Sequence, residues 1–187
     1  MSASPTVFLA MDFQEGIVER MAGAPVIAAE ARALEAARAH GIPVMFVRVA
    51  FRAGYPEAAA SHPTFGRLAE RGDAMVETAA ATQIHAELAP LPGEPVITKR
   101  RVSAFTGSDL DVLLRAARAE NLVLTGISTS GVVLSTLIEA SDLDFRLTVL
   151  EDACADGDPE VHRVLTEKVF PKRAVVTTVD AWAATLD

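Results

Sequence analysis

The chain has 187 residues, 50% of them hydrophobic and 22% charged, and its formal net charge is −8. This length suffices to bury one hydrophobic core, so we expect a single domain over residues 1–187. The acidic charge and the few aromatic residues argue against nucleic acid or a membrane surface as a partner, because both need a basic face. A small-molecule substrate is the partner that we expect.

The first residues, Met1 to Pro5, carry neither the basic segment nor the apolar core of a signal peptide. No run approaches the roughly 18 apolar residues of a membrane-spanning helix. The single cysteine, Cys154, excludes an internal disulfide, and the cysteine and histidines do not have zinc-ligand spacing. We therefore expect a cytoplasmic protein with no metal and no cofactor.

The first part of the chain is typical of two strands joined by a helix. Residues Thr6–Met11 form a short apolar run, as in a buried strand, and Asp12 follows at its end. Pro25 begins an alanine-rich helix that ends near Gly41. Ile42–Val49 is the second predicted strand.

Residues from about 50 to 92 contain clusters of Gly, Pro and Ser with only weak helical segments. A long irregular stretch inside a compact domain is more often a functional loop or lid than a separate domain, and we expect the former. Glu94–Thr98 is the third predicted strand, and Lys99 follows it.

The second half of the chain continues to alternate helices with strands. Ser108 and Asp111 resemble a capping box at the start of a helix. The later elements are expected at 121–126 (strand), 131–141 (helix), 145–150 (strand), from 158 (helix), 173–178 (strand) and around 182 (helix). A proline in the first turn supports the helix that begins at Asp158.

This alternation predicts an α/β fold, in which a parallel sheet is covered by helices on both faces. Ligands of such sheets bind beyond the carboxyl ends of the strands. Asp12, Lys99 and the turn from Gly126 to Val132 all follow predicted strands, so we expect them at one edge. The turn and the helix after it should direct backbone N–H groups toward one point, where a carboxylate, carbonyl or oxyanion would bind.

An Asp and a Lys that meet at the floor of a pocket can act as a general acid or base with an electrostatic partner. Their proximity would shift both pKa values, in a direction that depends on burial. They can equally form a structural ion pair near the strand ends, and the spacing alone favours neither interpretation.

Four segments together resemble the isochorismatase-like hydrolase superfamily, also called cysteine hydrolases. They are FLAMDFQEGIVERM, VITKRRVSAFTGSDLDVLL, LVLTGISTSGVVLSTLIEAS and VLEDACAD, in the family's order, and the resemblance runs from about Val7 to Thr178. It implies a three-layer α/β/α fold with a six-stranded, mostly parallel sheet of Rossmann-like topology. It also implies a homodimer or larger homo-oligomer that hydrolyses a small organic substrate.

The resemblance implies roles for three positions. The family's catalytic Asp matches Asp12, and its catalytic Lys, four residues before Ser-Ala-Phe, matches Lys99. Its nucleophilic Cys stands six residues after the Gly that closes the fourth strand, where this chain has Val132. Valine has no lone pair and no acidic proton, so the family's covalent amidase route is excluded.

Isochorismatases of the family also lack this cysteine, and they hydrolyse a vinyl ether: the Asp protonates the enol carbon, and water adds to the resulting cation. That route requires only Asp12 and Lys99, and it is our leading hypothesis. A non-catalytic ligand-binding or scaffold member of the fold is the alternative. A weaker alternative is an amidase that uses Ser130 or Cys154, because a serine at a helix start is usually a cap and a lone cysteine is usually an inert core residue.

Further residues complete the predicted substrate site. The backbone of Gly131 and Val132 is expected to hold a carbonyl or carboxylate, with Ser130 beside it. Gln14 is expected either to orient the catalytic carboxylate or contact the ligand, or to be a satisfied loop residue. Arg48 is a candidate for binding a carboxylate or carbonyl. The His and Asp pattern of metal-binding nicotinamidases does not occur after the second strand, so we expect no metal there.

Overall fold

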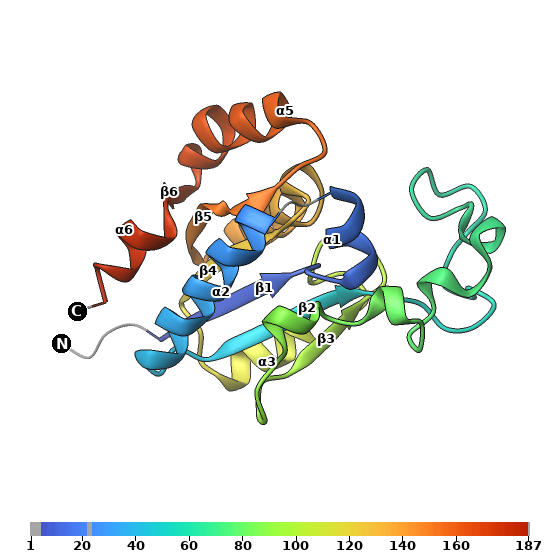
Figure 1. The fold of residues 1–187 in the computed structure, drawn as a ribbon, viewed down its shortest axis with the longest axis horizontal. Coiled ribbons are helices and arrows are strands. Elements are labelled where there is room, and N and C mark those ends of the chain that lie inside the picture. The colour runs from blue at the N-terminus through green and yellow to red at the C-terminus, as the bar shows by residue number, and fades with distance from the viewer. Residues whose placement is uncertain (1–4, 22–23, 187) are drawn as a thin grey trace.

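The computed structural model describes residues 5–21 and 24–186. At its centre is a six-stranded sheet in the order β3-β2-β1-β4-β5-β6 (Figure 1). The strands are β1 (Thr6–Met11), β2 (Val44–Val49), β3 (Val96–Lys99), β4 (Asn121–Ile127), β5 (Arg146–Ala155) and β6 (Ala174–Thr177). Every neighbouring pair is parallel. The carboxyl ends of the strands therefore share one edge of the sheet.

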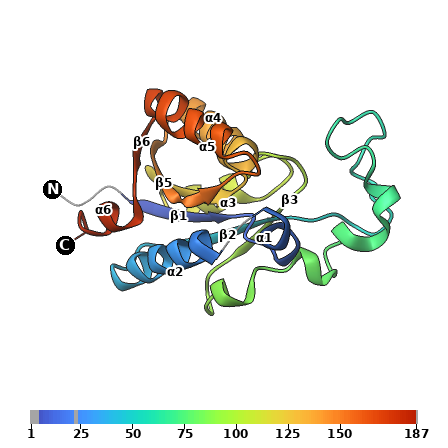
Figure 2. The same cartoon turned by 45° about the horizontal axis from the view of Figure 1, so that its top comes forward.

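Helices cover both faces of the sheet, as Figure 2 shows. The α-helices are α1 (Glu15–Met21), α2 (Ala24–Ala39), α3 (Leu110–Ala116), α4 (Leu134–Asp142), α5 (Pro159–Val164) and α6 (Val179–Ala183). Shorter or wider helical turns are η1 (Leu68–Met75), η2 (Ala80–Thr82), η3 (Ala86–Leu88), η4 (Thr129–Val133), η5 (Leu165–Val169) and η6 (Phe170–Lys172). Residues of α1, α2 and α6 pack on one face, and residues of α3, α4 and η6 pack on the other. The predicted three-layer α/β/α fold is confirmed.

The central strand shows why this sheet forms. In β1, Val7, Leu9 and Met11 point into the core on one face. Phe8 and Ala10 point into the core on the opposite face. Because successive side chains of a strand point to opposite faces, a strand buried on both sides must be apolar throughout. That requirement is met by the apolar run that the sequence places there.

Some element bounds differ from the prediction. The helix α1 was not expected, because its seven residues bury only Val18 fully and leave no periodic apolar face to recognise. The strand β5 continues past Leu150 through two acidic residues to Ala155. This extension follows a shift of register opposite β4, after which Gly126 pairs with Cys154.

The segment between β2 and β3, residues 50–95, leaves the sheet and is called the excursion below. It carries η1, η2 and η3, and it projects from the carboxyl edge of the sheet (Figure 1). A small apolar cluster of its own, with Phe51, Tyr55, Phe65 and Leu68, holds it together. No helix in the described part of the chain is long and apolar enough to cross a membrane.

Candidate functional site

The floor of the candidate site is an ion pair between Asp12 and Lys99. Asp12 directly follows β1, and Lys99 is the last residue of β3, two strands away in the sheet. The carboxylate Oδ2 of Asp12 lies 2.7 Å from Nζ of Lys99. Both side chains are buried, with exposed fractions of 7% for Asp12 and 2% for Lys99. The ammonium also donates a hydrogen bond of 2.6 Å to the carbonyl of Val102.

The environment of Asp12 raises the pKa of its carboxyl group above the ordinary value. Burial raises the pKa of Asp12, and the charge and hydrogen bond of Lys99 oppose this shift without cancelling it. Only one carboxylate oxygen is engaged: Oδ1 is buried and has no hydrogen-bond partner within the described residues. The carboxyl group of Asp12 therefore keeps hydrogen-bonding capacity that no described residue satisfies.

The turn from β4 into η4 forms the adjoining wall. A Cβ atom on Gly126 would lie 2.7 Å from the carbonyl oxygen of Met11, so only glycine allows β4 to pass so close to the residue before Asp12. The peptide bond between Ile127 and Ser128 is cis. The carbonyl of Ser128 accepts two hydrogen bonds of 3.2 Å, one from the N–H of Gly131 and one from the N–H of Val133. This turn brings the backbone and side chain of Ser128 to the same edge as Asp12.

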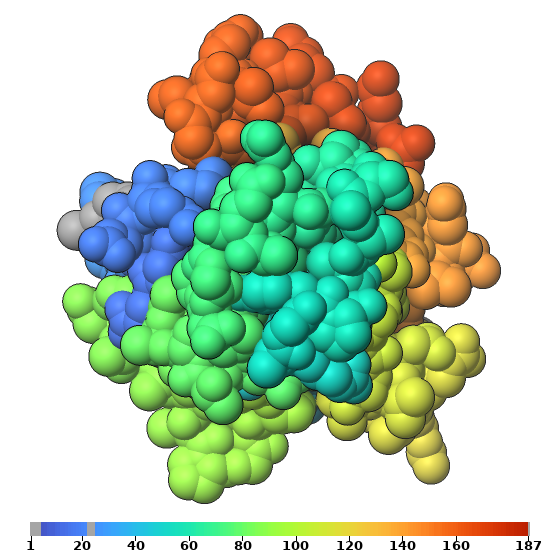
Figure 3. Space-filling view, turned by 90° about the vertical axis from the view of Figure 1, so that its right-hand side faces the viewer, coloured from blue at the N-terminus to red at the C-terminus, as the bar shows by residue number. Residues whose placement is uncertain are grey.

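A cavity of about 250 Å³ lies over this floor. Three groups of residues line it: the ends of the strands with the β4–η4 turn, the helix α1, and the excursion. They are Asp12, Val49, Lys99, Val102, Ile127, Ser128, Gly131 and Val132 from the first group, Ile17, Arg20 and Met21 from the second, and Thr64, Phe65, Leu68, Arg71 and Met75 from the third. Figure 3 shows the excursion spread over this end of the molecule with the N-terminal helical region beside it. The cavity is therefore roofed by segments outside the sheet.

The structure brings four of the predicted site residues together in this cavity: Asp12, Lys99, Gly131 and Val132. Gln14 does not line it. Its side-chain nitrogen donates 3.0 Å hydrogen bonds to the carbonyls of Val49 and Thr82, and its oxygen accepts one of 2.8 Å from the N–H of Val49. Its amide is thus fully engaged with the backbone, and it fastens the end of β2 and the excursion to the loop that follows Asp12.

Arg48 and Ser130 also lie outside the cavity lining. The guanidinium of Arg48 donates to Oγ1 of Thr98 at 3.1 Å and to Oε1 of Gln83 at 2.9 Å. Ser130 is exposed, and its backbone N–H donates a 2.7 Å hydrogen bond to the carboxylate of Asp156. These contacts hold the excursion and the start of η4 in place, and the predicted ligand contacts of both residues stay predictions.

Cys154 lies in β5, beside Gly126, and is buried. Burial raises the pKa of its thiol far above the ordinary range, with nearby carboxylates adding to the shift. The residue does not line the cavity. A neutral, enclosed thiol is a poor nucleophile, so its surroundings are those of a core residue.

Several lining residues were not anticipated from the sequence. Ser128 lies in the cavity, whereas the neighbouring Ser130 was the serine considered. Arg20 belongs to the unexpected helix α1, and Arg71 lies in a segment with no regular pattern. The one feature of the sequence that could have indicated Ser128 as a lining residue is its position two residues after Gly126, at the carboxyl end of β4. No group of three or more His, Cys, Asp or Glu side chains in the described ranges is arranged to hold a metal ion.

Known proteins share both the sequence and the fold. Residues 6–181 match the isochorismatase domain family. The chain is 36% identical over 185 residues to the isochorismatase family protein YecD of Escherichia coli, with 96% of this chain and 95% of the relative covered. It is 32% identical over 212 residues to the ureidoacrylate amidohydrolase RutB of Stutzerimonas stutzeri, with coverage of 100% and 82%.

A solved isochorismatase family protein from Burkholderia thailandensis superposes with a TM-score of 0.85 at 29% identity. The superposition covers 97% of this chain and 95% of that one. The domain match spans nearly the whole chain, and the solved relative shares its fold. This chain belongs to the isochorismatase family.

Proposed function

We propose that the protein hydrolyses a small organic substrate of the vinyl-ether type, with Asp12 as the general acid and base and without a covalent enzyme intermediate. The family assignment supports hydrolysis. The observation that carries the proposal is the set of contacts of Asp12. The residue lines the cavity, one of its oxygens lies 2.7 Å from the ammonium of Lys99, and the other is buried with no hydrogen-bond partner within the described residues.

The first step is transfer of the Asp12 proton to the terminal carbon of the C=C–O–R group. The oxygen-bearing carbon becomes an oxocarbenium ion, and the carboxyl group becomes a carboxylate. Water then adds to that carbon and returns one proton to Asp12. The resulting hemiketal transfers its hydroxyl proton to the leaving oxygen and separates into a ketone and an alcohol, so that one water is consumed in all.

Lys99 stabilises the Asp12 carboxylate formed by the first proton transfer, because its ammonium is already 2.7 Å from Oδ2. The raised pKa of Asp12 favours the protonated form that the first step needs. Val132, at the position where the resemblance puts the family's nucleophile, lines the cavity with a side chain that cannot act as a nucleophile. At this position water, and not the protein, must therefore attack the intermediate.

The experiment is a turnover assay of 2-methoxyacrylate and related vinyl ethers in D₂O, with mass spectrometry of the ketone. Protonation at carbon incorporates one solvent deuterium into a C–H position of the product, whereas amide hydrolysis incorporates none at carbon. We expect Asp12→Asn to lower kcat at least a hundredfold, because a carboxamide cannot donate this proton.

The matched control is Glu30→Gln. Glu30 is also a fully buried carboxylate with a raised pKa, but it does not line the cavity. It should retain the activity of the unmodified protein. Equal turnover by Asp12→Asn and the unmodified protein would falsify the proposal.

Amide hydrolysis is a second candidate, because the amidohydrolase RutB is 32% identical to this chain. Ser128 favours it further: the residue lines the cavity, and a Cβ on Gly131 would lie 2.6 Å from its Oγ, so the glycine leaves room for this hydroxyl. The test is a panel of small amides with intact-mass detection of an acyl adduct. Loss of the adduct in Ser128→Ala, but not in Ser130→Ala or Cys154→Ala, would support this candidate over the first.

A non-catalytic ligand-binding member of the family makes a different prediction. It would bind small molecules in the cavity without turning over any vinyl ether or amide. The variant Val132→Cys tests whether the protein lacks only the nucleophile or lacks the whole catalytic site. Amide hydrolysis gained by this variant would mean that the remaining residues still support catalysis, and no gain together with tight ligand binding would favour the binding role.

A further inference from the structure

Two arginines stand at the cavity that contains Asp12 and Lys99. Arg20 is the second-last residue of α1, and Arg71 lies in η1 of the excursion. Both also line a second hollow, of about 50 Å³, next to the larger cavity. Their side chains therefore form part of the wall between the two hollows, although they come from segments about fifty positions apart in the chain.

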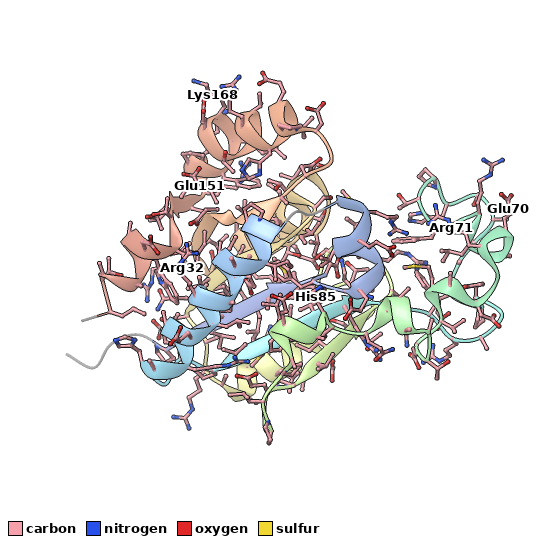
Figure 4. The ribbon with its side chains drawn as sticks, in the orientation of Figure 1. Arg32, Glu70, Arg71, His85, Glu151 and Lys168 are labelled. Atoms are coloured by element: carbon pink, nitrogen blue, oxygen red, sulfur yellow. The ribbon has the colours of Figure 1, made fainter. Side chains whose placement is uncertain are left out.

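Neither arginine has an ion-pair partner among the residues that the structure describes, whereas other arginines of the same region do. Arg52 pairs with Glu57, and Arg67 pairs with Glu70 on the exposed outer side. Figure 4 shows Glu70 at the outer edge of the excursion and Arg71 on its inner side, toward the body of the molecule. Two exposed arginines that line one cavity, without an ion-pair partner among the described residues, are notable in a chain whose net charge is −8.

The charges of the residues that line the cavity favour an anionic ligand. Its ionisable residues are Asp12, Lys99, Arg20 and Arg71. The charges of the first two cancel when both are ionised, which leaves two positive charges from the arginines. The guanidinium group presents a planar fork of N–H donors that matches the two oxygens of a carboxylate.

We propose that Arg20 and Arg71 together form a carboxylate-binding subsite, so that the substrate is a small organic acid held by its carboxylate at the mouth of the cavity. The inference rests on the proposed function for the position of the reacting group, which lies at the Asp12 end. Between the two ends the lining is apolar, from Ile17, Met21 and Leu68 among others. The substrate class is therefore a carboxylate joined through a short apolar or unsaturated stretch to the bond that is hydrolysed.

The two arginines come from separate elements, and this has a structural consequence. Bridging them with one carboxylate links the excursion to α1, which the apolar contact of Ile17 with the excursion cluster already brings close. Binding of the acid should therefore slow amide hydrogen exchange in residues 64–75 as well as in α1. A neutral ligand of the same shape lacks this effect, because it has no charge for the guanidinium groups.

The experiment measures binding without turnover. Acrylate, crotonate and cinnamate are titrated against the full chain by calorimetry or ligand-observed NMR, each beside its neutral alcohol, allyl, crotyl or cinnamyl alcohol. We expect at least one acid to bind tenfold or more tightly than its alcohol, and this preference to fall as salt rises. Arg20→Met and Arg71→Met should each reduce acid binding about five- to tenfold and leave alcohol binding unchanged.

Arg67→Met is the matched control, because Arg67 lies in the same excursion but pairs with Glu70 and does not line the cavity. It should bind the acids as the unmodified protein does. The inference is overturned if no acid binds better than its alcohol, or if the Arg67 variant loses as much binding as the Arg71 variant.

Failure of this inference can be told from failure of the proposed function. Vinyl-ether turnover that depends on Asp12 but shows no preference for carboxylates would leave the function standing and overturn the subsite. Binding of the acids that depends on the arginines, without any turnover, would support the subsite and overturn the proposed function. With turnover present, Arg20→Met and Arg71→Met should raise KM for carboxylate substrates much more than they lower kcat.

Discussion

Asp12 and Glu30 are both buried carboxylates whose pKa is raised by burial, yet their surroundings differ. Each has one oxygen without a hydrogen-bond partner in the described part of the chain. Glu30 lies on α2 against the sheet, where its Oε1 is 3.1 Å from Oγ1 of Thr125. Asp12 has the ammonium of Lys99 at 2.7 Å and lines a cavity.

The two carboxylates therefore differ in whether a cation lies beside them and in whether they line a cavity. Glu30 is fully enclosed, and the hydroxyl beside it is its only direct partner among described side chains, so its neutral form is the favoured one and no ligand reaches it. Asp12 has a cation to stabilise its charged form and a cavity to receive a substrate. Asp12 is therefore the carboxylate that, in the proposed reaction, loses and regains a proton.

The largest loss of stability should come from Lys99→Met, which removes the cation beside Asp12. A buried carboxylate left without its cation costs about 3 to 5 kcal/mol of unfolding free energy. Asp12 can escape part of this cost by taking up a proton. A carboxyl group whose folded-state pKa is raised confers stability that is fully present below the unfolded pKa and is lost as pH rises through the folded pKa.

Urea unfolding should therefore show a larger loss for Lys99→Met at pH 8 than at pH 5. The double variant with Asp12→Asn should regain much of the stability at pH 8, because it no longer contains the buried charge. Equal losses at both pH values would show that Asp12 does not respond to its partner.

Gly126→Ala should have the next largest effect on stability, because Gly126 adjoins a residue that contacts Glu30 and packs against the residue that precedes Asp12. Its neighbour Thr125 contacts Glu30, and a Cβ at Gly126 would press on the carbonyl of Met11 at 2.7 Å, just before Asp12. We expect a loss of about 2 kcal/mol by thermal or urea unfolding. Gly157→Ala is the control. A Cβ at Gly157 would meet no atom closer than 3.7 Å, so the stability of the protein should scarcely change.

Glu30→Gln tests the enclosed carboxylate. Burial raises the pKa of Glu30 well above its ordinary value, while Thr125 and Arg38 oppose this shift. The unmodified protein should therefore lose stability as pH rises through the folded-state pKa, by about 1 kcal/mol or more, and the glutamine variant should lack this part of the slope. Glu35→Gln, on the exposed side of α2, should keep the slope. An unchanged slope in Glu30→Gln would mean that Glu30 is ionised throughout.

Asp156 provides a carboxylate of the opposite kind, with the smallest expected effect. Burial raises its pKa, but hydrogen bonds from Ser130 and the backbone of Asp158 and Gly157 outweigh this, so its pKa is lowered. Its stabilisation is present above the unfolded pKa and is lost as pH falls through the folded pKa. Asp156→Asn should cost about 0.5 to 1 kcal/mol at pH 7 and progressively less as pH falls below the ordinary pKa of Asp, as measured by urea unfolding.

Part of the site could be predicted because it follows from the ends of strands. Apolar runs mark where β1, β3 and β4 lie, and parallel strands place their carboxyl ends at one edge. Asp12, Lys99 and the Gly126 turn were therefore expected at one edge, and the strand order β3-β2-β1-β4 brings them close together. The roles expected for Gln14, Arg48 and Ser130 had no such geometric support, and their side chains are instead engaged with the backbone or lie outside the cavity.

Local apolar patterns and the direction of parallel strands were enough to predict the layered α/β fold, its six strands and the placement of Asp12 and Lys99 at one edge of the sheet. The residues that close the cavity from above depended on tertiary packing. Arg20, Phe65 and Arg71 lie in α1 and the excursion, where no periodic pattern fixes the direction of a side chain. Their positions depend on long-range contacts, such as the hydrogen bonds of Gln14 and the excursion's apolar cluster, that no local stretch of sequence contains.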